Sequence, residues 1–164
     1  MHLLHRIGLV GLAGLLATTP VLGQKTDDQI LPKSVELLKQ GEAHLAAGRF
    51  MEADDALETA LAVDPRNRRA FVVMAQVAQK QKLYGQAIRF TNKALALEPA
   101  DRDAIEIQGE AMVELGAIAR AKANLTKLQK LCPNGCQQLS SLSSAINRGP
   151  TMAAAKPPQT RKSN

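Results

Sequence analysis

The sequence has very few aromatic residues: its 164 positions include no Trp, one Tyr and three Phe, so aromatics make up only 2% of the chain. A core without large rings must be assembled from Leu, Ala, Val and Ile, and apolar residues as a group amount to 45%. No segment alternates between polar and β-branched apolar residues, so no strand is predicted. Because Ala and Leu are strong helix formers, the composition predicts an all-α protein, with room for about one domain.

Groups that carry catalytic or metal chemistry are also scarce. Only three histidines occur, and His44 is the single one beyond the apolar N-terminal segment, which excludes a Cys/His or Ser/His/Asp set and a conventional metal site. No Gly-rich phosphate loop follows a strand, and no GxSxG surrounds the serines of SSLSS at residues 140–144. We therefore expect a protein that is not an enzyme, with no cofactor and no metal.

Residues 1–23 have the pattern of a secretory signal peptide. Arg6 precedes an apolar run at residues 7–17, and Val21 and Gly23 stand at the recognition positions before a cleavage site. The run is shorter than the roughly 20 residues that cross a bilayer, and it has no cysteine for a lipid anchor. We expect cleavage after Gly23 and a periplasmic or secreted protein; an uncleaved membrane anchor is the alternative.

Positive charge gathers at the C-terminus. The net charge is +6, and removal of residues 1–23, which hold Arg6 and no acid, would leave +5. Residues 148–164 contain no acid and carry four of these charges: Arg148, Lys156, Arg161 and Lys162. Their Pro-, Ala- and Lys-rich composition predicts a disordered basic tail. The tail either solubilises the protein or makes peripheral contact with an anionic membrane or polymer, and without interleaved aromatics it does not indicate nucleic-acid binding.

The body of the chain contains an internal repeat. LAVDPRNRRA at residues 61–70 returns as LALEPADRDA at residues 95–104, and a proline recurs every 34 residues at Pro65, Pro99 and Pro133. Blocks at residues 34–67, 68–101 and 102–135 each contain two apolar stripes at helical spacing. In the first block the stripes are Leu37, Gly41, His44, Leu45 and Ala53, Leu57, Ala60, Leu61, separated at Gly48. Asn67 and Asp101 follow two of the prolines and are expected to cap the next helix.

This arrangement resembles the tetratricopeptide repeat (TPR) family. The family's small residue on the first helix matches Gly41, Ala75 and Gly109, its small residue on the second helix matches Ala53, Ala87 and Ala121, and its closing Pro matches all three prolines. The resemblance implies a right-handed α-solenoid of three TPR helix pairs at residues 34–135, after a lead-in at residues 24–33. Residues 136–147, apolar at Leu139, Leu142 and Ile146, are expected to form a capping helix. Together with the signal pattern, this favours a small exported bacterial TPR protein.

In the TPR family, the first helices of successive repeats line a concave groove that binds a peptide or a helix. The matching positions here are Leu38, Lys39, Glu42, Arg69, Val72, Val73, Gln76, Lys80, Asp103, Glu106, Glu110 and Glu114. The family's clamp for a chaperone's C-terminal carboxylate needs Lys and Asn where this chain has Leu38 and Glu42, so the resemblance does not extend to that ligand. The resemblance implies a non-enzymatic scaffold of the cell envelope with a protein partner, positively charged near the third block; a merely solvated helix face is the alternative.

Two cysteines, Cys132 and Cys136, occur in LCPNGC between the last repeat and the cap. An even number of close cysteines in an exported protein predicts a disulfide, which would clamp this turn and stabilise the fold by about 2 kcal/mol. Free thiols and a redox-active pair are the alternatives. The three intervening residues and the absence of a βαβ pattern argue against redox activity. The tripeptide NLT at Asn124 matches a glycosylation acceptor but lies inside a predicted helix.

Overall fold

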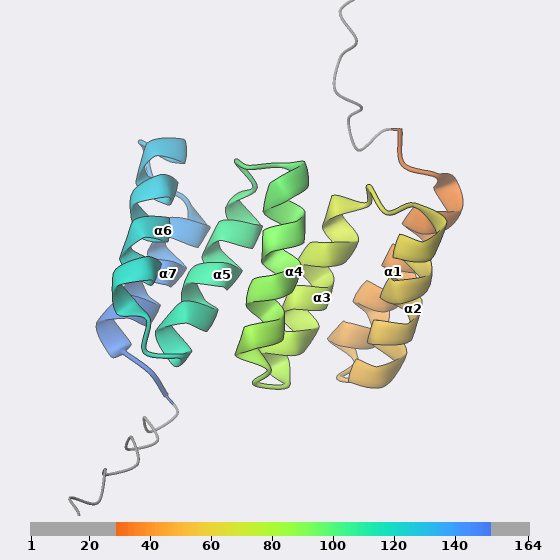
Figure 1. Cartoon of the computed structure of the whole chain (residues 1–164), viewed down its shortest axis with the longest axis horizontal. Coiled ribbons are helices and arrows are strands. Elements are labelled where there is room, and N and C mark those ends of the chain that lie inside the picture. The colour runs from red at the N-terminus through yellow and green to blue at the C-terminus, as the bar shows by residue number, and fades with distance from the viewer. Residues whose placement is uncertain (1–28, 152–164) are drawn as a thin grey trace, which may run out of the picture.

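The computed structural model describes residues 29–151, which form seven α-helices joined by short turns (Figure 1). Their bounds are α1 (Pro32–Ala46), α2 (Phe50–Val63), α3 (Arg68–Lys80), α4 (Tyr84–Leu97), α5 (Arg102–Glu114), α6 (Ile118–Leu131) and α7 (Gln137–Arg148). The described residues contain no strand, so the all-α fold predicted from the composition is confirmed. The expected signal peptide at residues 1–23 and most of the basic tail lie outside the described residues.

The helices form two layers (Figure 1). In the inner layer, α1, α3, α5 and α7 contact one another in that order, whereas α2, α4 and α6 form the outer layer and pack between successive inner helices. Each 34-residue block supplies one inner and one outer helix, and α7 is the last inner helix. The predicted architecture of three helix pairs followed by a terminal helix is therefore confirmed.

Every outer helix ends two residues before one of the repeated prolines. A residue that precedes proline is disfavoured in the α region because the proline ring clashes with its backbone. Accordingly Asp64, Glu98 and Cys132 leave the helix with φ of −143°, −141° and −130°. The next inner helix then starts at a side-chain cap. Asn67 and Asp101 accept hydrogen bonds from the backbone N–H groups of Ala70 and Ala104 at 3.2 and 2.9 Å, as predicted.

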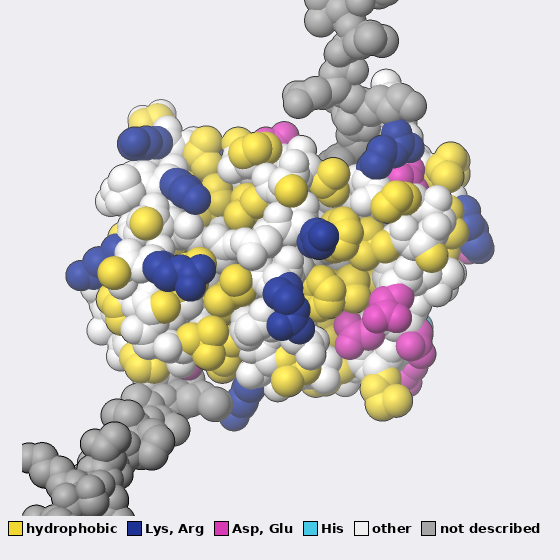
Figure 2. Space-filling model, viewed as in Figure 1, with side chains coloured by type: hydrophobic (Ala, Val, Ile, Leu, Met, Phe, Trp, Pro, Cys, Tyr) yellow, Lys and Arg dark blue, Asp and Glu magenta, His cyan; other side chains and the backbone are white. Residues whose placement is uncertain are grey.

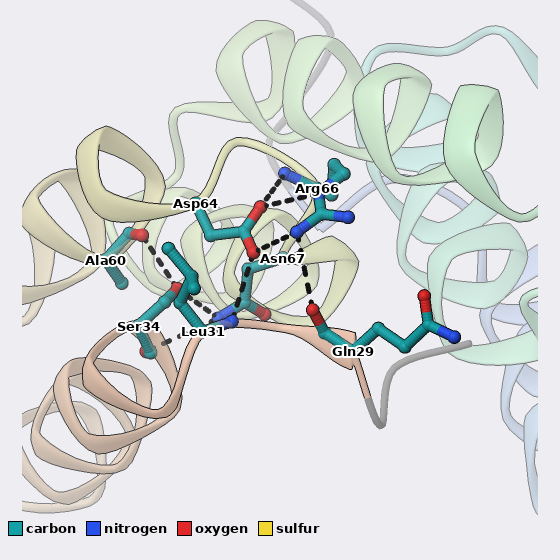
Figure 3. Close-up of polar contacts among 7 residues, drawn as sticks. All are labelled: Gln29, Leu31, Ser34, Ala60, Asp64, Arg66 and Asn67. Atoms are coloured by element: carbon teal, nitrogen blue, oxygen red, sulfur yellow. Dashed lines mark hydrogen bonds and ion pairs between the residues drawn. The ribbon is translucent and has the colours of Figure 1, made fainter. Parts of the chain in front are cut away.

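The first of these corners also holds the chain that precedes α1 (Figure 3). Asp64 is only 2% exposed, and its carboxylate accepts hydrogen bonds from the Leu31 N–H at 3.1 Å and from Arg66 Nη2 at 2.8 Å. The same Arg66 nitrogen donates to the Gln29 carbonyl at 3.3 Å. Hydrogen bonding from Arg66 outweighs burial and lowers the pKa of Asp64 to about 2. An ionised carboxylate therefore ties the lead-in to the first repeat joint.

A second set of hydrogen bonds at this corner joins α1 to the neighbouring helices (Figure 3). The Ser34 hydroxyl is buried, donates to the Ala60 carbonyl at 2.7 Å and accepts from Asn67 Nδ2 at 2.8 Å. Helix α1 itself begins at Pro32, two residues before the expected start of the repeat. Proline is favoured in the first turn because its missing N–H would have no partner there. Pro32 and Lys33 therefore belong to the helix and not to the lead-in.

Small residues allow the helices to approach closely, as expected. Ala53, Ala87 and Ala121 are fully buried, one in each outer helix. A Cβ atom added at Gly41 would lie 2.6 Å from Leu57 of α2, whereas one added at Gly109 would lie 2.7 Å from Leu142 of α7. In the third repeat, the glycine thus allows close approach of α5 to the terminal helix α7.

Helix α7 covers the end of the stack. Leu142 and Ala145 are buried and belong to two core clusters that also contain residues of α5 and α6. The helix extends through Arg148, which had been assigned to the tail, and ends at Gly149, whose φ is +76°. Arg148 is therefore the last residue of the helix, and its Nη2 atom lies 3.8 Å from the Glu114 carboxylate on α5. Within the described region, no helix combines the length and apolarity needed to cross a membrane.

Candidate functional site

The inner layer contains a pocket of about 450 Å³ that extends over four helices. It is lined mainly by polar side chains, together with the apolar Leu45 and Ile107. The full lining is Leu45 from α1; Gln76, Gln79 and Lys80 from α3; Asp103, Glu106, Ile107 and Glu110 from α5; and Gln137 and Gln138 from α7. This surface is hydrogen-bonding and charged, which suits a polar segment better than an apolar ligand.

The structure brings together five of the groove residues predicted from the sequence. Gln76, Lys80, Asp103, Glu106 and Glu110 all line the pocket. They come together because α3 and α5 lie side by side in the inner layer, so that equivalent faces of successive helices form one surface. The third-block carboxylates are therefore placed on the inner surface of the stack.

Other predicted groove residues lie outside the pocket. Lys39 is exposed on α1. Arg69 forms two ion pairs, Nε to Glu42 Oε1 at 3.1 Å and Nη1 to Asp103 Oδ2 at 3.0 Å. Its guanidinium thus links Glu42 of α1 to Asp103 of α5, the two inner helices that flank α3. Glu42 and Asp103 are consequently compensated by a positive charge within the protein.

The prediction that Val73 faces the groove is wrong. Val73 has no exposed surface and packs with Leu38, another expected groove residue, in the core cluster between the first and second repeats. Val72 is equally buried, in the cluster between the second and third repeats. Both valines are buried because α3 has helices on both sides, so two faces of the helix are covered. These apolar side chains support the groove from beneath and are not available to a partner.

Glu106 and Glu110 have only uncharged hydrogen-bond partners among the described residues. Gln79 Nε2 donates to Glu110 Oε2 at 2.7 Å, and a hydrogen bond from Ser141 favours the ionised form of Glu106. Burial nevertheless raises the pKa of Glu106 above its ordinary value, and the Glu110 and Asp103 carboxylates add to this effect. These two carboxylates give the pocket negative charge, and neither forms an ion pair with a cation of the described residues.

Glu114 ends the acidic stripe on α5 and is already in contact with the start of the tail. Its Oε2 atom accepts hydrogen bonds from the Thr151 backbone N–H at 2.8 Å and from the Thr151 hydroxyl at 2.7 Å. Arg148 approaches the other carboxylate oxygen. Tyr84 of α4 is buried beside them, and its pKa is raised by that burial and by the Glu114 charge. Glu114 thus acts as an anchor for the chain that leaves α7.

Several pocket residues were not found from the sequence. Gln79, Gln137 and Gln138 line the pocket, and Gln138 Nε2 donates to Asp103 Oδ1 at 2.8 Å. The only available signal for Gln79 was its position one turn after Gln76 on the same helix. Gln137 and Gln138 could not be placed without knowing that the first turn of α7 lies beside the start of α5.

The outer face carries charge of opposite sign at its two ends (Figure 2). Helix α2 has four acids and no base, whereas α4 and α6 together have six bases and no acid. The bases are Arg89, Lys93, Arg120, Lys122, Lys127 and Lys130, all exposed. None of them forms an ion pair with another residue of the described part.

The cysteines form the predicted disulfide. Cys132 and Cys136 are bonded across a Cα separation of 5.8 Å, and the bond links the end of α6 to the residue before α7. The turn that it closes includes Gly135 in the left-handed region, with φ of +88°. Within residues 29–151, no group of three or more His, Cys, Asp or Glu side chains could hold a metal ion.

Comparison with known proteins identifies the fold. No protein-family model and no curated protein matches the sequence. Solved TPR domains do match the structure. The first TPR domain of Spaghetti (RPAP3), bound to the HSP90 peptide SRMEEVD, has a TM-score of 0.63 at 24% identity over 70% of this chain and 96% of that one. The TPR2B domain of yeast Sti1, in a pHsp70 complex, has a TM-score of 0.65 at 19% identity over 71% and 97%.

A third similar structure is part of an enzyme. O-GlcNAc transferase from Thermobaculum terrenum has a TM-score of 0.63 at 22% identity, but the match covers 70% of this chain and only 22% of the transferase. The three matches share the stack of helix pairs with this chain. Its fold is therefore that of a TPR domain.

Proposed function

We propose that this protein is a non-enzymatic interaction module that binds a segment of a partner protein in the groove formed by α1, α3, α5 and α7. The observation that carries the proposal is the polar pocket on this inner surface, which four helices line and which leaves Glu106 and Glu110 without a cationic partner among the described residues. Of the TPR domains with this fold, that of RPAP3 is bound to an HSP90 peptide and that of Sti1 is in a pHsp70 complex.

The partner segment is expected to be positively charged. The HSP90 peptide bound to RPAP3 ends in EEVD and is acidic, whereas three carboxylates and one lysine line the pocket of this chain. An acidic peptide would meet carboxylates of its own sign here, which is unfavourable in a partly buried site. A Lys or Arg side chain would instead compensate Glu106 and Glu110.

Site-specific photo-crosslinking in cells that express the full chain tests this proposal. A photoreactive amino acid at Gln76, in the pocket, is expected to capture a discrete protein partner. The same amino acid at Gln86, exposed on α4 of the outer layer, is the matched control and should not capture it. Charge reversal by Glu106→Lys with Glu110→Lys should abolish capture from position 76. Equal capture from both positions, or capture that survives the reversal, would contradict a groove-bound partner.

We further propose that the protein is exported to the envelope of a bacterium. Two features support this assignment: the signal pattern at residues 1–23 and the Cys132–Cys136 disulfide, because disulfides persist in oxidising compartments. N-terminal sequencing of the protein from a periplasmic fraction is expected to begin at Gln24. A product that retains Met1, or that stays in the cytoplasmic fraction, would contradict export with cleavage.

A second candidate function is contact with an anionic surface, and the six exposed bases of α4 and α6 favour it (Figure 2). Vesicles of phosphatidylglycerol test this candidate against neutral phosphatidylcholine vesicles. Lys122→Gln, Lys127→Gln and Lys130→Gln together should weaken binding to the anionic vesicles about tenfold, and added salt should weaken it further because it screens exposed charges. Binding that is equal for both lipids or insensitive to the substitutions would eliminate this candidate.

A further inference from the structure

The end of the described chain lies at the rim of the proposed groove. After α7, Thr151 donates two hydrogen bonds to Glu114, and it also contacts Tyr84 on α4. The chain has therefore crossed from α7 over the last turn of α5 towards the neighbouring repeat. Thr151, the last described residue, thus lies beside the helix that carries the pocket acids.

The acids on α5 form one line that starts at this anchor. Glu114, Glu110 and Glu106 are each four residues apart, so they lie on the same face of the helix. With a rise of 1.5 Å per residue, Glu110 lies about 6 Å and Glu106 about 12 Å from Glu114 along the axis. The anchor and the pocket thus belong to one continuous acidic stripe.

The remaining chain carries the complementary charge within reach of this stripe. Residues 152–164 contain Lys156, Arg161 and Lys162 and no acid. Lys156 is five positions after Thr151, and an extended chain covers up to about 17 Å over five steps, which exceeds the axial distance from Glu114 to Glu106. The sequence MAAAKPP at residues 152–158 has small side chains and two prolines, which suits an extended segment on a groove.

From the anchor, the acidic stripe and the reach of the chain, we propose that residues 152–164 bind in the groove of their own molecule, with Lys156 at Glu106 and Glu110. This inference rests on the proposed use of the groove and names its resting occupant. Because the segment is tethered at Glu114, its effective concentration at the pocket is in the millimolar range, so weak ion pairs suffice to hold it. A partner must therefore displace the tail before it can bind.

The test uses the full chain and a labelled synthetic peptide with the sequence of residues 150–164. The peptide should bind poorly to the unaltered chain and about tenfold more tightly to a chain with Lys156→Gln, Arg161→Gln and Lys162→Gln, whose tail no longer competes. The matched control, Lys122→Gln with Lys127→Gln and Lys130→Gln, removes the same charge from the outer face and should leave peptide binding at the unaltered level. If the peptide binds the unaltered chain and the chain with the neutralised tail equally, or binds neither, the inference is overturned.

A second comparison locates the bound segment. In the chain with the neutralised tail, Glu106→Gln with Glu110→Gln should reduce peptide binding about tenfold, whereas Glu58→Gln, an exposed acid on α2, should not. Circular dichroism should show that each variant retains its helices. Unchanged peptide binding in the pocket variant overturns the placement.

The self-association of the full chain distinguishes binding within one molecule from exchange of tails between two. Sedimentation velocity should give a monomer whether or not the tail is neutralised, and a dimer that dissociates on tail neutralisation contradicts the proposal. The outcome of the crosslinking experiment separates failure of this inference from failure of the proposed function. If the peptide does not bind but crosslinking from position 76 still captures a partner, only the tail inference fails.

Discussion

Lys82 has a left-handed backbone conformation, and the equivalent position in the first and third repeats is a glycine. Gly48, Lys82 and Gly116 are spaced by 34 residues, follow α1, α3 and α5, and have φ of +72°, +61° and +74°. Glycine adopts this left-handed region without steric cost, whereas a side chain brings its Cβ close to the following carbonyl. The second repeat therefore contains a strained turn, although the chain keeps the same path there.

Lys82→Gly is expected to raise the free energy of unfolding by about 0.5–1 kcal/mol, because relief of the strain exceeds the entropy that glycine adds to the unfolded chain. Lys93→Gly, an exposed Lys→Gly change inside α4, is the control and should lower stability by about 1 kcal/mol. Urea denaturation followed by circular dichroism measures both. A loss of stability in the Lys82 variant would contradict the strain argument.

Asp64 makes the stability of the protein depend on acidic pH. Its pKa is about 2 in the folded state, against 3.8 for an unperturbed Asp, so folding favours the ionised form. The resulting stabilisation is fully present above pH 4 and is lost as the pH falls towards about 2. Asp64→Asn removes the titrating group, and its thermal midpoint should therefore fall less than that of the unaltered protein between pH 5 and pH 2.5. Parallel pH profiles for the two proteins would exclude Asp64 as the source.

At the scale of the helices, the third repeat differs from the first in what its glycine approaches. Gly41 faces its own partner helix α2, whereas Gly109 faces Leu142 of α7. A buried network accompanies this packing: Gln108 Nε2 donates to Asn92 of α4 at 2.7 Å, and Asn124 Nδ2 of α6 donates to Gln108 Oε1 at 3.0 Å. The terminal helix and a polar core thus fix the last repeat.

Gly109→Ala tests the close contact of α5 with α7. The added Cβ would lie 2.7 Å from the buried Leu142 side chain, and overpacking costs about 1–3 kcal/mol, which exceeds the gain in helix propensity of about 1 kcal/mol. We expect a net loss of about 1 kcal/mol. Gly85→Ala, where nothing lies within 4 Å of the new atom, should be neutral or stabilising. Gly109→Ala should therefore lower the denaturation midpoint, whereas Gly85→Ala should leave it unchanged or raise it; equal shifts would contradict the packing argument.

At the scale of the whole molecule, much of the architecture could be predicted from the sequence. Gly48 and the prolines mark where helices end, and their spacing of 34 residues placed the three helix pairs and the cap. Which side chains of the inner helices are buried was harder to predict, because an inner helix is covered on more than one face. Seven of the thirteen residues of α3 are buried, and Val73 is among them for this reason.

The candidate site was predictable in part. The acids of α5 could be placed on one helix face from their spacing, but their partners come from other helices. Arg69 reaches Asp103 from α3 and Gln138 reaches it from α7, and no local pattern encodes such contacts. Thr151 likewise reaches Glu114 across 37 positions of sequence. Gln108 and Asn124 are polar yet buried, and no local pattern in the sequence indicates this.

The core clusters share residues, so the stack should unfold as one unit. Phe90 packs against the clusters of the first and second joints, Ile146 packs against both clusters that contain α7 residues, and Ile88 joins these two pairs of clusters. Leu142→Ala should lower stability by about 2–5 kcal/mol because it leaves a cavity in a fully buried site. Circular dichroism and the fluorescence of Tyr84, a repeat away, should report the same shifted midpoint. Two separate midpoints would show that the last repeat unfolds independently.

The buried position of Asn124 restricts how the protein can be produced. Its side-chain amide is 3% exposed and donates hydrogen bonds to Ile105 and Gln108, although Asn124 begins an Asn-Leu-Thr acceptor for N-linked sugar. A eukaryotic secretory host that attached an oligosaccharide to the emerging chain would place a bulky group where the folded protein has no room. Such a host should retain the product in its endoplasmic reticulum, and Thr126→Ala, which removes the acceptor at an exposed position, should release it.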